Sequence, residues 1–296
     1  MDSASELIPQ GTEDGTLTFF SPIFCESFHS HSGAYQEAVG KFVQPTQLRQ
    51  KAQEPELAIL DICYGLGYNS AAALEAVWQI NPACHIHLIA LELNPAVPKA
   101  AIAHHCLQDF SPAVQTCLSN LATTHQVNTD TLTARLYIGD ARQRLPALPE
   151  QNFLAAAIFL DPFSPPRCPQ LWTVEFLALV SHCLDPQGIL ATYSCAAAVR
   201  SGLMMGGLQV GSSPPIGRRS PGTVAAYIPT ELPPLSQQET EHLHTQAAIP
   251  YRDPTLRDNA QTILARRQQE QQQSKLEPTK AWKKRWFLDL DLVKPD

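Results

Sequence analysis

Short apolar runs alternate with stretches of helical spacing through the middle of the chain. The apolar runs cover residues 57–60, 85–91, 132–138, 153–160 and 188–193. Between them, apolar residues spaced three and four apart predict helices over 69–80, after Pro98 and over 174–184. Buried strands that alternate with helices are typical of a mostly parallel sheet covered by helices on both faces. The pattern therefore predicts an α/β, Rossmann-like fold.

The two ends of the chain depart from this alternation. Residues 1–15 are polar and predict a loose arm, and the mixed segment that follows has helical spacing in its second half. Beyond residue 200, frequent Pro and Gly favour a hairpin and long loops, and from residue 251 the chain is polar. We predict three parts: an N-terminal arm and segment over 1–50, the alternating core over 51–228, and a Pro-rich linker with a polar, locally basic tail over 229–296.

Acidic residues stand at the ends of four predicted strands. They are Asp61, Glu92, Asp140 and Asp161. Ligands of open parallel sheets bind at the carboxyl ends of the strands, so these four carboxylates are expected to surround one site. Taken singly, each acid is more often a helix cap or a turn residue.

The loop after the first core strand carries two glycines, Gly65 and Gly67, and leads directly into a helix. Glycine there lets the backbone turn sharply and approach a ligand closely. A dinucleotide fold requires a third glycine, but Ser70 occupies that position. Asp61, at the end of the strand, would sit badly beside a pyrophosphate and suits the ammonium group of S-adenosylmethionine (SAM). The loop therefore favours SAM as the cofactor, and 51–228 as a SAM-dependent methyltransferase domain of class I type.

Each residue of the predicted cofactor site has an expected role. Gly65, Gly67 and Asn69 form the loop, and Glu92 accepts hydrogen bonds from ribose hydroxyls, a role that both cofactors would use. Asp140, followed by Ala141, accepts the adenine amino group. Cys63 stands where many SAM loops have a first glycine, so we expect its backbone to avoid positive φ.

Cysteine and histidine spacing gives no sign of a metal site. None of the eight cysteines stands three residues from another, and the three His-x-His pairs have no carboxylate or cysteine at metal-ligand spacing. The polar, acidic start is unlike a secretory signal, and no apolar run reaches the roughly 18–20 residues of a membrane span. We expect a cytoplasmic protein with reduced thiols, without metal and without a membrane segment.

The net charge of −7 over 296 residues argues against indiscriminate binding to nucleic acid. Basic residues nevertheless gather in two places, at Arg218-Arg219 and in the tail at 282–286, where tryptophans flank them. Three interpretations of this tail stay open: it contacts RNA, it forms an amphipathic packing helix, or it is disordered. The composition is still compatible with one RNA that is bound by local basic patches.

Several motifs resemble the MnmC-like methyltransferase family between about residues 19 and 225. They are the Gly-x-Gly-x-Asn loop, Gly139-Asp140, and the run from Asp161-Pro162-Phe163-Ser164-Pro165 through Pro169 to Trp172, together with Phe28, Ser30, Gly33 and Glu37 near the N-terminus. The resemblance implies conversion of 5-aminomethyluridine to 5-methylaminomethyluridine at the wobble position of tRNA. The partner would be a tRNA anticodon loop. No second glycine fingerprint occurs, so we expect a stand-alone methyltransferase without the flavin half, whose aminomethyl substrate other enzymes supply.

The resemblance also implies roles for residues outside the cofactor loop. Asp161 would orient the ammonium group of the substrate and accept or relay its proton. Phe163 and Trp172 would stack on a flipped base, although Trp172 is equally well explained as a core anchor. Arg200 and Arg218 would contact anticodon-loop phosphates, or else be solvated surface charges. Pro162 replaces a small residue and is expected to stiffen the catalytic turn.

Three other functions fit parts of the sequence. A small-molecule amine N-methyltransferase, or a relative of the aminopropyltransferases, would use the same fold and the same acid after the fourth strand, and the acidic net charge favours it. A nicotinamide-dependent oxidoreductase is disfavoured by Asp61 and Ser70. A non-catalytic scaffold or RNA-binding partner is disfavoured by the intact motif around Asp161.

Overall fold

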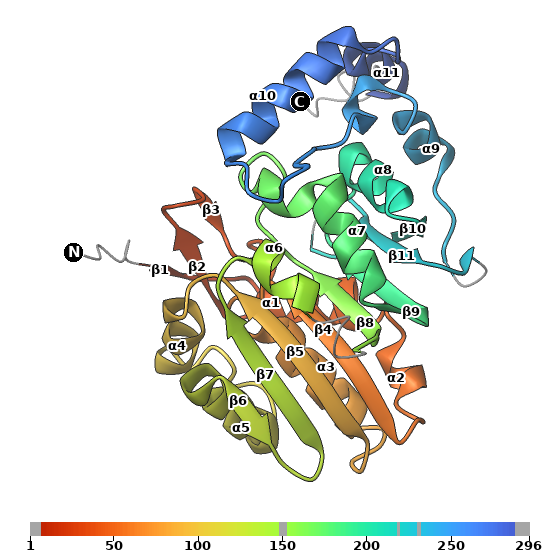
Figure 1. Cartoon of the computed structure of the whole chain (residues 1–296). Helices are drawn as coiled ribbons and strands as arrows, with labels where there is room; N and C mark the ends of the chain where they lie inside the picture. Colours follow the sequence, from red (N-terminus) through yellow and green to blue (C-terminus); the bar gives the residue numbers. More distant parts are fainter. Residues whose placement is uncertain (1–6, 148–152, 218–219, 230–231, 288–296) are drawn as a thin grey trace, which may run out of the picture.

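An eight-stranded sheet forms the centre of the computed structural model, which describes residues 7–147, 153–217, 220–229 and 232–287 (Figure 1). In spatial order its strands are β10 (Gln209–Ser213), β11 (Gly222–Ala226), β9 (Leu184–Thr192), β8 (Ala155–Leu160), β4 (Glu56–Ile62), β5 (His85–Glu92), β7 (Leu132–Ile138) and β6 (Gln126–Asn128). The five central strands are parallel, whereas β6, β11 and β10 join the edges through antiparallel pairings. The predicted α/β fold is confirmed.

The strand order reverses at β4, because the next strand along the chain, β5, lies on one side of it and β8 lies on the other. In open parallel sheets a ligand binds outside the carboxyl ends of the strands at such a reversal. The topology therefore places the site at the ends of β4 and β8, where Asp61 and Asp161 lie.

Helices cover both faces of the sheet. In chain order they are α1 (Ala34–Glu37), the π-helix η1 (Ala38–Val43), α2 (Leu48–Lys51), α3 (Tyr68–Trp78), α4 (Ala96–Ala103), α5 (Pro112–Thr124), α6 (Ala141–Arg144), the 3₁₀ turns η2 (Leu145–Ala147) and η4 (Pro169–Trp172), α7 (Val174–His182) and α8 (Ala197–Met205). One buried cluster joins the sheet to η1, α2, α3, α4 and α5, and a second joins the other face to α6, α7 and α8. Alternate residues of β4 enter the two clusters, as a strand covered on both faces requires.

The N-terminal segment forms a small antiparallel sheet of its own. Its strands are β1 (Ile8–Gly11), β2 (Leu17–Ser21) and β3 (Glu26–Ser27). Residues 8–11, expected in a loose arm, pair with β2 because the Asp14 carboxylate fixes the intervening turn by accepting hydrogen bonds from Thr12 and Thr16. The predicted hairpin beyond residue 200 is confirmed by the pairing of β10 with β11.

The C-terminal residues form a helical layer beside α7 and α8, which we call the C-terminal layer (Figure 1). It contains α9 (Gln237–His242), the 3₁₀ turn η6 (Gln246–Ala248), α10 (Ala260–Gln273) and α11 (Thr279–Phe287). Although its sequence is polar, Tyr251, Ile263 and Trp282 are buried, and the Trp282 ring stacks on His242 at 4.0 Å. The division of the chain at residues 50 and 228 stays a prediction. Among the described helices, none combines the length and the apolar character needed to cross a membrane.

Candidate active site

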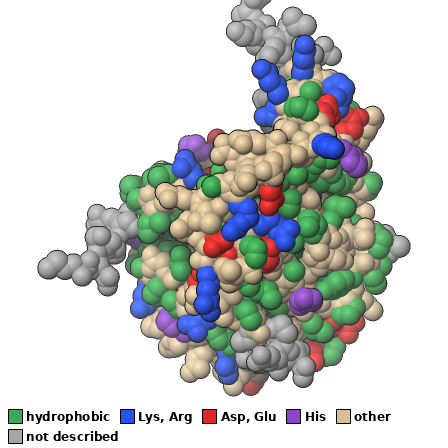
Figure 2. All heavy atoms as spheres, turned by 45° about the horizontal axis from the view of Figure 1, so that its top comes forward, with side chains coloured by type: hydrophobic (Ala, Val, Ile, Leu, Met, Phe, Trp, Pro, Cys, Tyr) green, Lys and Arg blue, Asp and Glu red, His purple; other side chains and the backbone are tan. Residues whose placement is uncertain are grey.

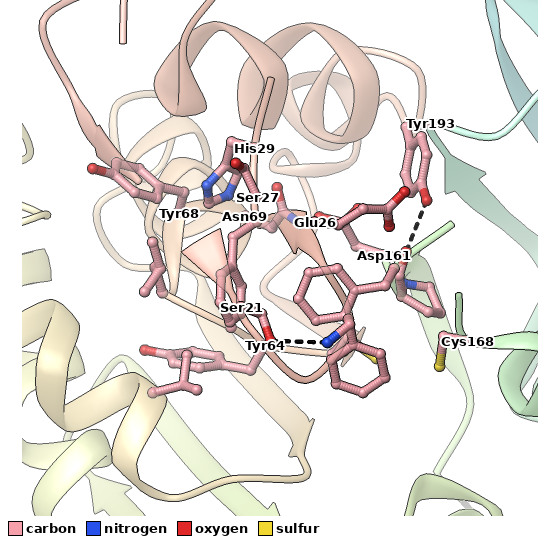
Figure 3. Close-up of a pocket in the computed structure, with 18 of the residues that line it drawn as sticks. Ser21, Glu26, Ser27, His29, Tyr64, Tyr68, Asn69, Asp161, Cys168 and Tyr193 are labelled. Carbon is pink, nitrogen blue, oxygen red and sulfur yellow. Dashed lines mark hydrogen bonds between the residues drawn. The ribbon is translucent and has the colours of Figure 1, made fainter. Parts of the chain in front are cut away.

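A cavity of about 420 Å³ opens at the carboxyl ends of β4 and β8 (Figure 3). Its walls include the N-terminal sheet, α1 with η1, the glycine loop after β4, the end of β5, and the turn after β8. Its volume falls within the roughly 300–1,000 Å³ that is usual for cofactor and small-molecule pockets. The predicted residues Gly65, Asn69, Glu92, Asp161 and Phe163 all line it.

The glycine loop turns sharply at the start of the cavity. The backbone N–H groups of Cys63 and Tyr64 both donate to the carbonyl of Leu91, at 3.0 and 2.9 Å. This double contact requires the left-handed conformation at Cys63, whose φ is +69°. The expectation that Cys63 avoids positive φ is therefore wrong. The local turn outweighs the roughly 1–2 kcal/mol that a non-glycine residue loses in this conformation.

Gly67 begins α3 and has no space for a side chain. Its φ is +88°, and a Cβ atom would lie 2.6 Å from the hydroxyl oxygen of Tyr64. Gly65 also has positive φ, at +57°, and its N–H donates to Glu92 at 2.9 Å. Gly65 thus brings its backbone to the cavity, which is what close approach to a ligand requires, whereas Gly67 makes room for the Tyr64 ring that lines the cavity.

Glu92 is held at the end of β5 by main-chain donors. Its carboxylate accepts hydrogen bonds from Gly65 and from Asn94, the latter at 2.8 Å, and only 7% of the residue is exposed. Burial raises the pKa of Glu92, and these backbone donors oppose the rise. A carboxylate fixed in this way at the second strand end can accept hydrogen bonds from ligand hydroxyls, so the predicted ribose contact stays a prediction that the geometry permits.

Asp61 lies beneath the glycine loop and is fully buried. One carboxyl oxygen accepts the Ser70 hydroxyl at 2.6 Å, whereas Oδ1 has no hydrogen-bond partner among the described residues. Burial raises the pKa of Asp61 from 3.8 to about 7, and the charge of Glu92 adds to the rise while the Ser70 hydroxyl opposes it. An unsatisfied buried carboxyl oxygen is costly unless a ligand cation or a water meets it, which is compatible with the predicted ammonium contact.

We expect Asp61→Asn to make the protein more stable, by an amount that grows as the pH rises from about 4 to 7. The folded state holds the Asp61 proton up to about pH 7, whereas the unfolded chain releases it near 3.8. The wild type therefore loses up to about 1.4 kcal/mol of unfolding free energy per pH unit across this window, and the variant does not. Urea unfolding between pH 4.5 and 8 measures the difference. Exposed Asp109→Asn is the control, and equal curves for both variants would contradict the prediction.

Asp140 and Ala141 line a smaller recess of about 200 Å³ next to the main cavity, whose walls include Cys63 and Glu92 as well. Asp140 caps α6 by accepting the N–H of Arg142, and it forms an ion pair with the same residue at 2.7 Å. Arg142 also reaches the buried Asp253 of the C-terminal layer, at 2.8 Å. The adenine contact of Asp140 stays a prediction; the structure adds that Arg142, which lines this recess, is also bonded to the C-terminal layer.

Asp161 directly follows β8 and lines the cavity beside the glycine loop (Figure 3). Its Oδ2 atom accepts a hydrogen bond from the side-chain amide of Asn69 at 2.8 Å. Burial, together with the charges of Glu37 and Asp61, raises the pKa of Asp161 well above 3.8, and the Asn69 amide and Lys41 oppose the rise. A carboxylate with a raised pKa beside a cavity accepts a proton more readily than an ordinary aspartate does.

Phe163 forms an aromatic cluster with two residues of the N-terminal segment. Its ring stacks on Phe24 at 4.4 Å and meets Phe28 edge-on at 5.0 Å. Trp172, by contrast, is fully buried and does not line the cavity; its Nε1 donates to the carbonyl of Phe163 at 2.8 Å. Of the two explanations for Trp172, the core anchor is correct and base stacking is wrong, because no face of the ring is accessible.

Arg200 does not lie on the surface. Its side chain is 2% exposed and donates to Thr223, to the carbonyl of Gly222 and to Glu239. The predicted contact of Arg200 with phosphates is therefore wrong, because its guanidinium joins α8, β11 and α9 inside the protein. Arg218 lies outside the described residues.

Several side chains of the cavity were not predicted. Glu26 accepts hydrogen bonds from the backbone and hydroxyl of Ser164, so the N-terminal sheet holds the turn that follows Asp161. Lys41, which is 2% exposed, pairs with Glu37 at 2.9 Å, and Glu37 also holds Ser30. No pattern around Glu26 or Lys41 marks them. Within the described ranges, no group of three or more His, Cys, Asp or Glu is arranged to hold a metal ion.

Comparisons with known proteins agree on one family. The family described as S-adenosyl-L-methionine-dependent methyltransferase matches residues 104–228. An uncharacterized protein of Methanocaldococcus jannaschii is 29% identical over 89% of this chain and 72% of its own length. The tRNA 5-methylaminomethyl-2-thiouridine biosynthesis bifunctional protein MnmC of an Acidovorax species is 30% identical over 76% of this chain. The chain spans only 36% of that bifunctional relative.

The crystal structure of MNMC2 from Aquifex aeolicus superimposes with a TM-score of 0.80 at 32% sequence identity, covering 92% of this chain and 87% of that one. The two proteins therefore have the same fold and similar sequences over nearly their whole lengths. Together with the glycine loop and the acidic strand ends, this similarity confirms the resemblance found in the motifs. The chain belongs to the MnmC methyltransferase-domain family and is a SAM-dependent methyltransferase.

Proposed function

We propose that the protein transfers a methyl group from SAM to the primary amine of 5-aminomethyluridine at the wobble position of tRNA. The observation that carries the proposal is the place of Asp161, whose carboxyl group lies in the cavity wall between the glycine loop and the aromatic cluster of Phe24, Phe28 and Phe163. A carboxylate beside aromatic side chains suits an ammonium group attached to a planar base. The relatives named for 5-methylaminomethyl-2-thiouridine biosynthesis support the same substrate class.

The residues present fit SAM, which carries an ammonium, a sulfonium and a ribose. Asp61 has a buried oxygen without a hydrogen-bond partner among the described residues, Glu92 is fixed at the second strand end, and Gly65 brings its backbone to the cavity wall without a side chain. When bound, SAM supplies an electrophilic methyl group for a neutral amine. We propose Gly65 and Glu92, with Asp61 and Gly67 behind them, for one side of the cofactor site, and Asp140 with Ala141 for the adenine end.

Asp161 has two tasks in this proposal. Its carboxylate binds the ammonium of the substrate, which fixes the nitrogen at the end of β8, and it then accepts one N–H proton so that the nitrogen lone pair is released. The proton moves from nitrogen to a carboxyl oxygen, and the bonding pair of the broken N–H bond stays on nitrogen. Because Glu26 holds Ser164 and Tyr193 donates to the carbonyl of Pro162 at 2.9 Å, the turn that carries Asp161 is fixed on both sides.

A direct assay tests the proposed substrate. The protein is incubated with methyl-labelled SAM and tRNA that lacks the final methyl group, and the digested nucleosides are identified by mass spectrometry. We expect labelled 5-methylaminomethyluridine. If SAM binds and the labelled nucleoside does not form, the tRNA proposal is wrong.

A small-molecule amine is the second candidate, because the cavity is rich in acids. Glu26, Glu37, Glu92 and Asp161 line it, and Lys41 is the one lysine or arginine among the described lining residues. This charge favours an ammonium group whatever molecule carries it. Polyamines and simple primary amines are therefore added as alternative acceptors in the same assay, and transfer to them without transfer to tRNA would support this candidate.

We propose that α11 contributes to tRNA binding. Lys280, Lys283 and Lys284 are exposed and are spaced three and four residues apart, so they share one side of the helix, away from buried Trp282. Lys and Arg side chains gather on the projecting C-terminal layer in Figure 2. Trp286 and Arg285 are engaged with Glu241, so the three lysines are the cations that this helix offers to phosphates.

Replacing these three lysines with glutamate is expected to raise the KM for tRNA by about tenfold or more, because phosphate contacts and the release of counterions are lost. The Kd for SAM should stay unchanged, and the dependence of tRNA binding on salt concentration should become weaker. Lys99→Glu on exposed α4 is the control. An unchanged KM for tRNA in the triple variant would remove α11 from the tRNA interface.

A further inference from the structure

Asn69 was predicted to bind the cofactor, yet its side chain is directed at Asp161 (Figure 3). Asn69 is the second residue of α3 and is 4% exposed, and its Nδ2 atom donates to Oδ2 of Asp161 at 2.8 Å. The two residues are 92 positions apart in the chain. They meet because β4 and β8 are neighbours and the backbone N–H of Asp161 donates to the carbonyl of Ile62 at 3.1 Å.

The bond divides the two oxygens of the Asp161 carboxyl group. Oδ2 is held by the Asn69 amide, whereas Oδ1 accepts no hydrogen bond from the described residues; Asp161 itself lines the cavity. An amide N–H can only donate, so this contact favours the ionised carboxylate and fixes its plane. A carboxylate held by one oxygen keeps the other available for a ligand.

We propose that Asn69 is a positioning residue for Asp161: it holds Oδ2, directs Oδ1 toward the substrate amine and keeps the carboxylate ionised. This inference rests on the proposed role of Asp161. It also gives the glycine loop a second task, because the turn that approaches the cofactor carries, two residues after Gly67, the amide that orients the proton acceptor. In this proposal the glycine loop and the start of α3 position the methyl donor directly and the methyl acceptor through Asp161.

The surroundings of Asp161 explain why such a donor is needed. The groups that face it are Glu37 of α1, Lys41 of η1, Asp61 of β4 and Cys63 of the loop, while Tyr193 after β9 donates to the carbonyl of the next residue, Pro162. Burial and the two acids raise the pKa of Asp161, and Lys41 is itself paired with Glu37. The Asn69 amide is thus a short-range contact that favours the charged form against burial and two like charges.

Asn69→Leu, which has a similar size and no donor, tests the proposal without any methyl acceptor. The titration of Asp161 is followed by ¹³C NMR of carboxyl-labelled aspartate in the full-length protein, with the signal assigned from Asp161→Asn. We expect the midpoint to move upward by about one pH unit or more in Asn69→Leu, because a hydrogen bond to the ionised form is lost. Gln79→Leu, an amide removed from the exposed end of the same helix, should leave the midpoint unchanged.

Binding and rate measurements separate positioning from cofactor contact. The Kd for SAM should stay within about twofold of the wild type, and the pH at which methyl transfer reaches half of its maximum should rise with the NMR midpoint. Asn69→Ser, which keeps a shorter donor, should give a smaller shift, and it carries the test if the leucine variant does not fold. An unchanged Asp161 midpoint with weakened SAM binding would overturn the inference and return Asn69 to the cofactor site. Because the NMR titration uses no methyl acceptor, its result does not depend on the result of the tRNA assay.

Discussion

Replacing Asp161 with asparagine is expected to lower the rate of methyl transfer about 10²- to 10⁴-fold at neutral pH, the usual contribution of a positioned general base. Asparagine has the same shape and can still accept the hydrogen bond from Asn69, so the turn after β8 should keep its structure. What is lost is the negative charge that binds the ammonium and the oxygen that accepts its proton. Single-turnover rates with SAM in excess measure the effect.

The pH dependence makes this prediction sharper. At higher pH a growing fraction of the substrate amine is neutral without help, so the rate of Asp161→Asn should climb with pH after the wild-type rate has levelled off. Asp130→Asn, the same change at an exposed position, should retain the wild-type profile. Full activity of Asp161→Asn at neutral pH would remove Asp161 from the proton transfer.

Arg200→Ala is expected to lower the free energy of unfolding by about 3–5 kcal/mol, because it breaks a buried ion pair and leaves its partner. The guanidinium is 2% exposed and lies 2.7 Å from Glu239, whose side chain is 16% exposed. It also satisfies the Thr223 hydroxyl at 2.9 Å and the carbonyl of Gly222 at 3.1 Å. Urea unfolding at neutral pH measures the loss.

Two further variants identify the cause of that loss. Arg252→Ala breaks an ion pair to Glu175 in which the arginine is 37% exposed, and it should lose at most about 1 kcal/mol. Arg200→Met with Glu239→Gln removes both charges but keeps a side-chain oxygen for the cap of α9, and should recover part of the stability, since a buried pair contributes little relative to uncharged residues of similar size. If Arg200→Ala lost no more than Arg252→Ala, the buried network would not stabilise this part of the fold.

The acidic strand ends could be predicted because they depend on local sequence. Each of Asp61, Glu92, Asp140 and Asp161 follows an apolar run, and parallel strands bring such positions to one edge of the sheet. That rule does not predict in which direction each of these four side chains points. Asp61 lies below the loop because it is fully buried, and Asp140 pairs with Arg142, whose other partner, Asp253, is 111 positions along the chain.

The burial of Arg200 could not be predicted from its helix alone. Its neighbours Ala198, Val199 and Gly202 are buried as well, so most of the surface of α8 is covered and no single apolar side marks the core. The charge of the residue favours the surface or a phosphate contact, whereas the structure places it in the core. Its partner, Glu239, belongs to the capping box of α9. The sequence alone predicts a linker and a polar tail for this part of the chain.

The N-terminal wall of the cavity could not be predicted from the sequence, for a different reason. Glu26 and Ser164 are 138 positions apart, and nothing in either segment specifies the other. The same holds for Asn69 and Asp161, whose contact follows from the neighbouring positions of β4 and β8 and not from a motif. Contacts of this kind are set by how the strands are ordered, which an unaligned sequence does not contain.

The ion pair between Arg142 and Asp253 has a consequence for synthesis of the protein. The two residues are 111 positions apart, so at roughly 5–20 residues per second a ribosome makes the arginine about 5–20 s before the aspartate. During that interval Arg142 has Asp140 alone as its acidic partner, and the second buried cluster still lacks Tyr251 and Ile263. Once β11 has been made, the nascent chain therefore carries every strand of the sheet while part of this apolar cluster is still exposed, and the adenine end of the site gains its final charge balance only when Asp253 has been made.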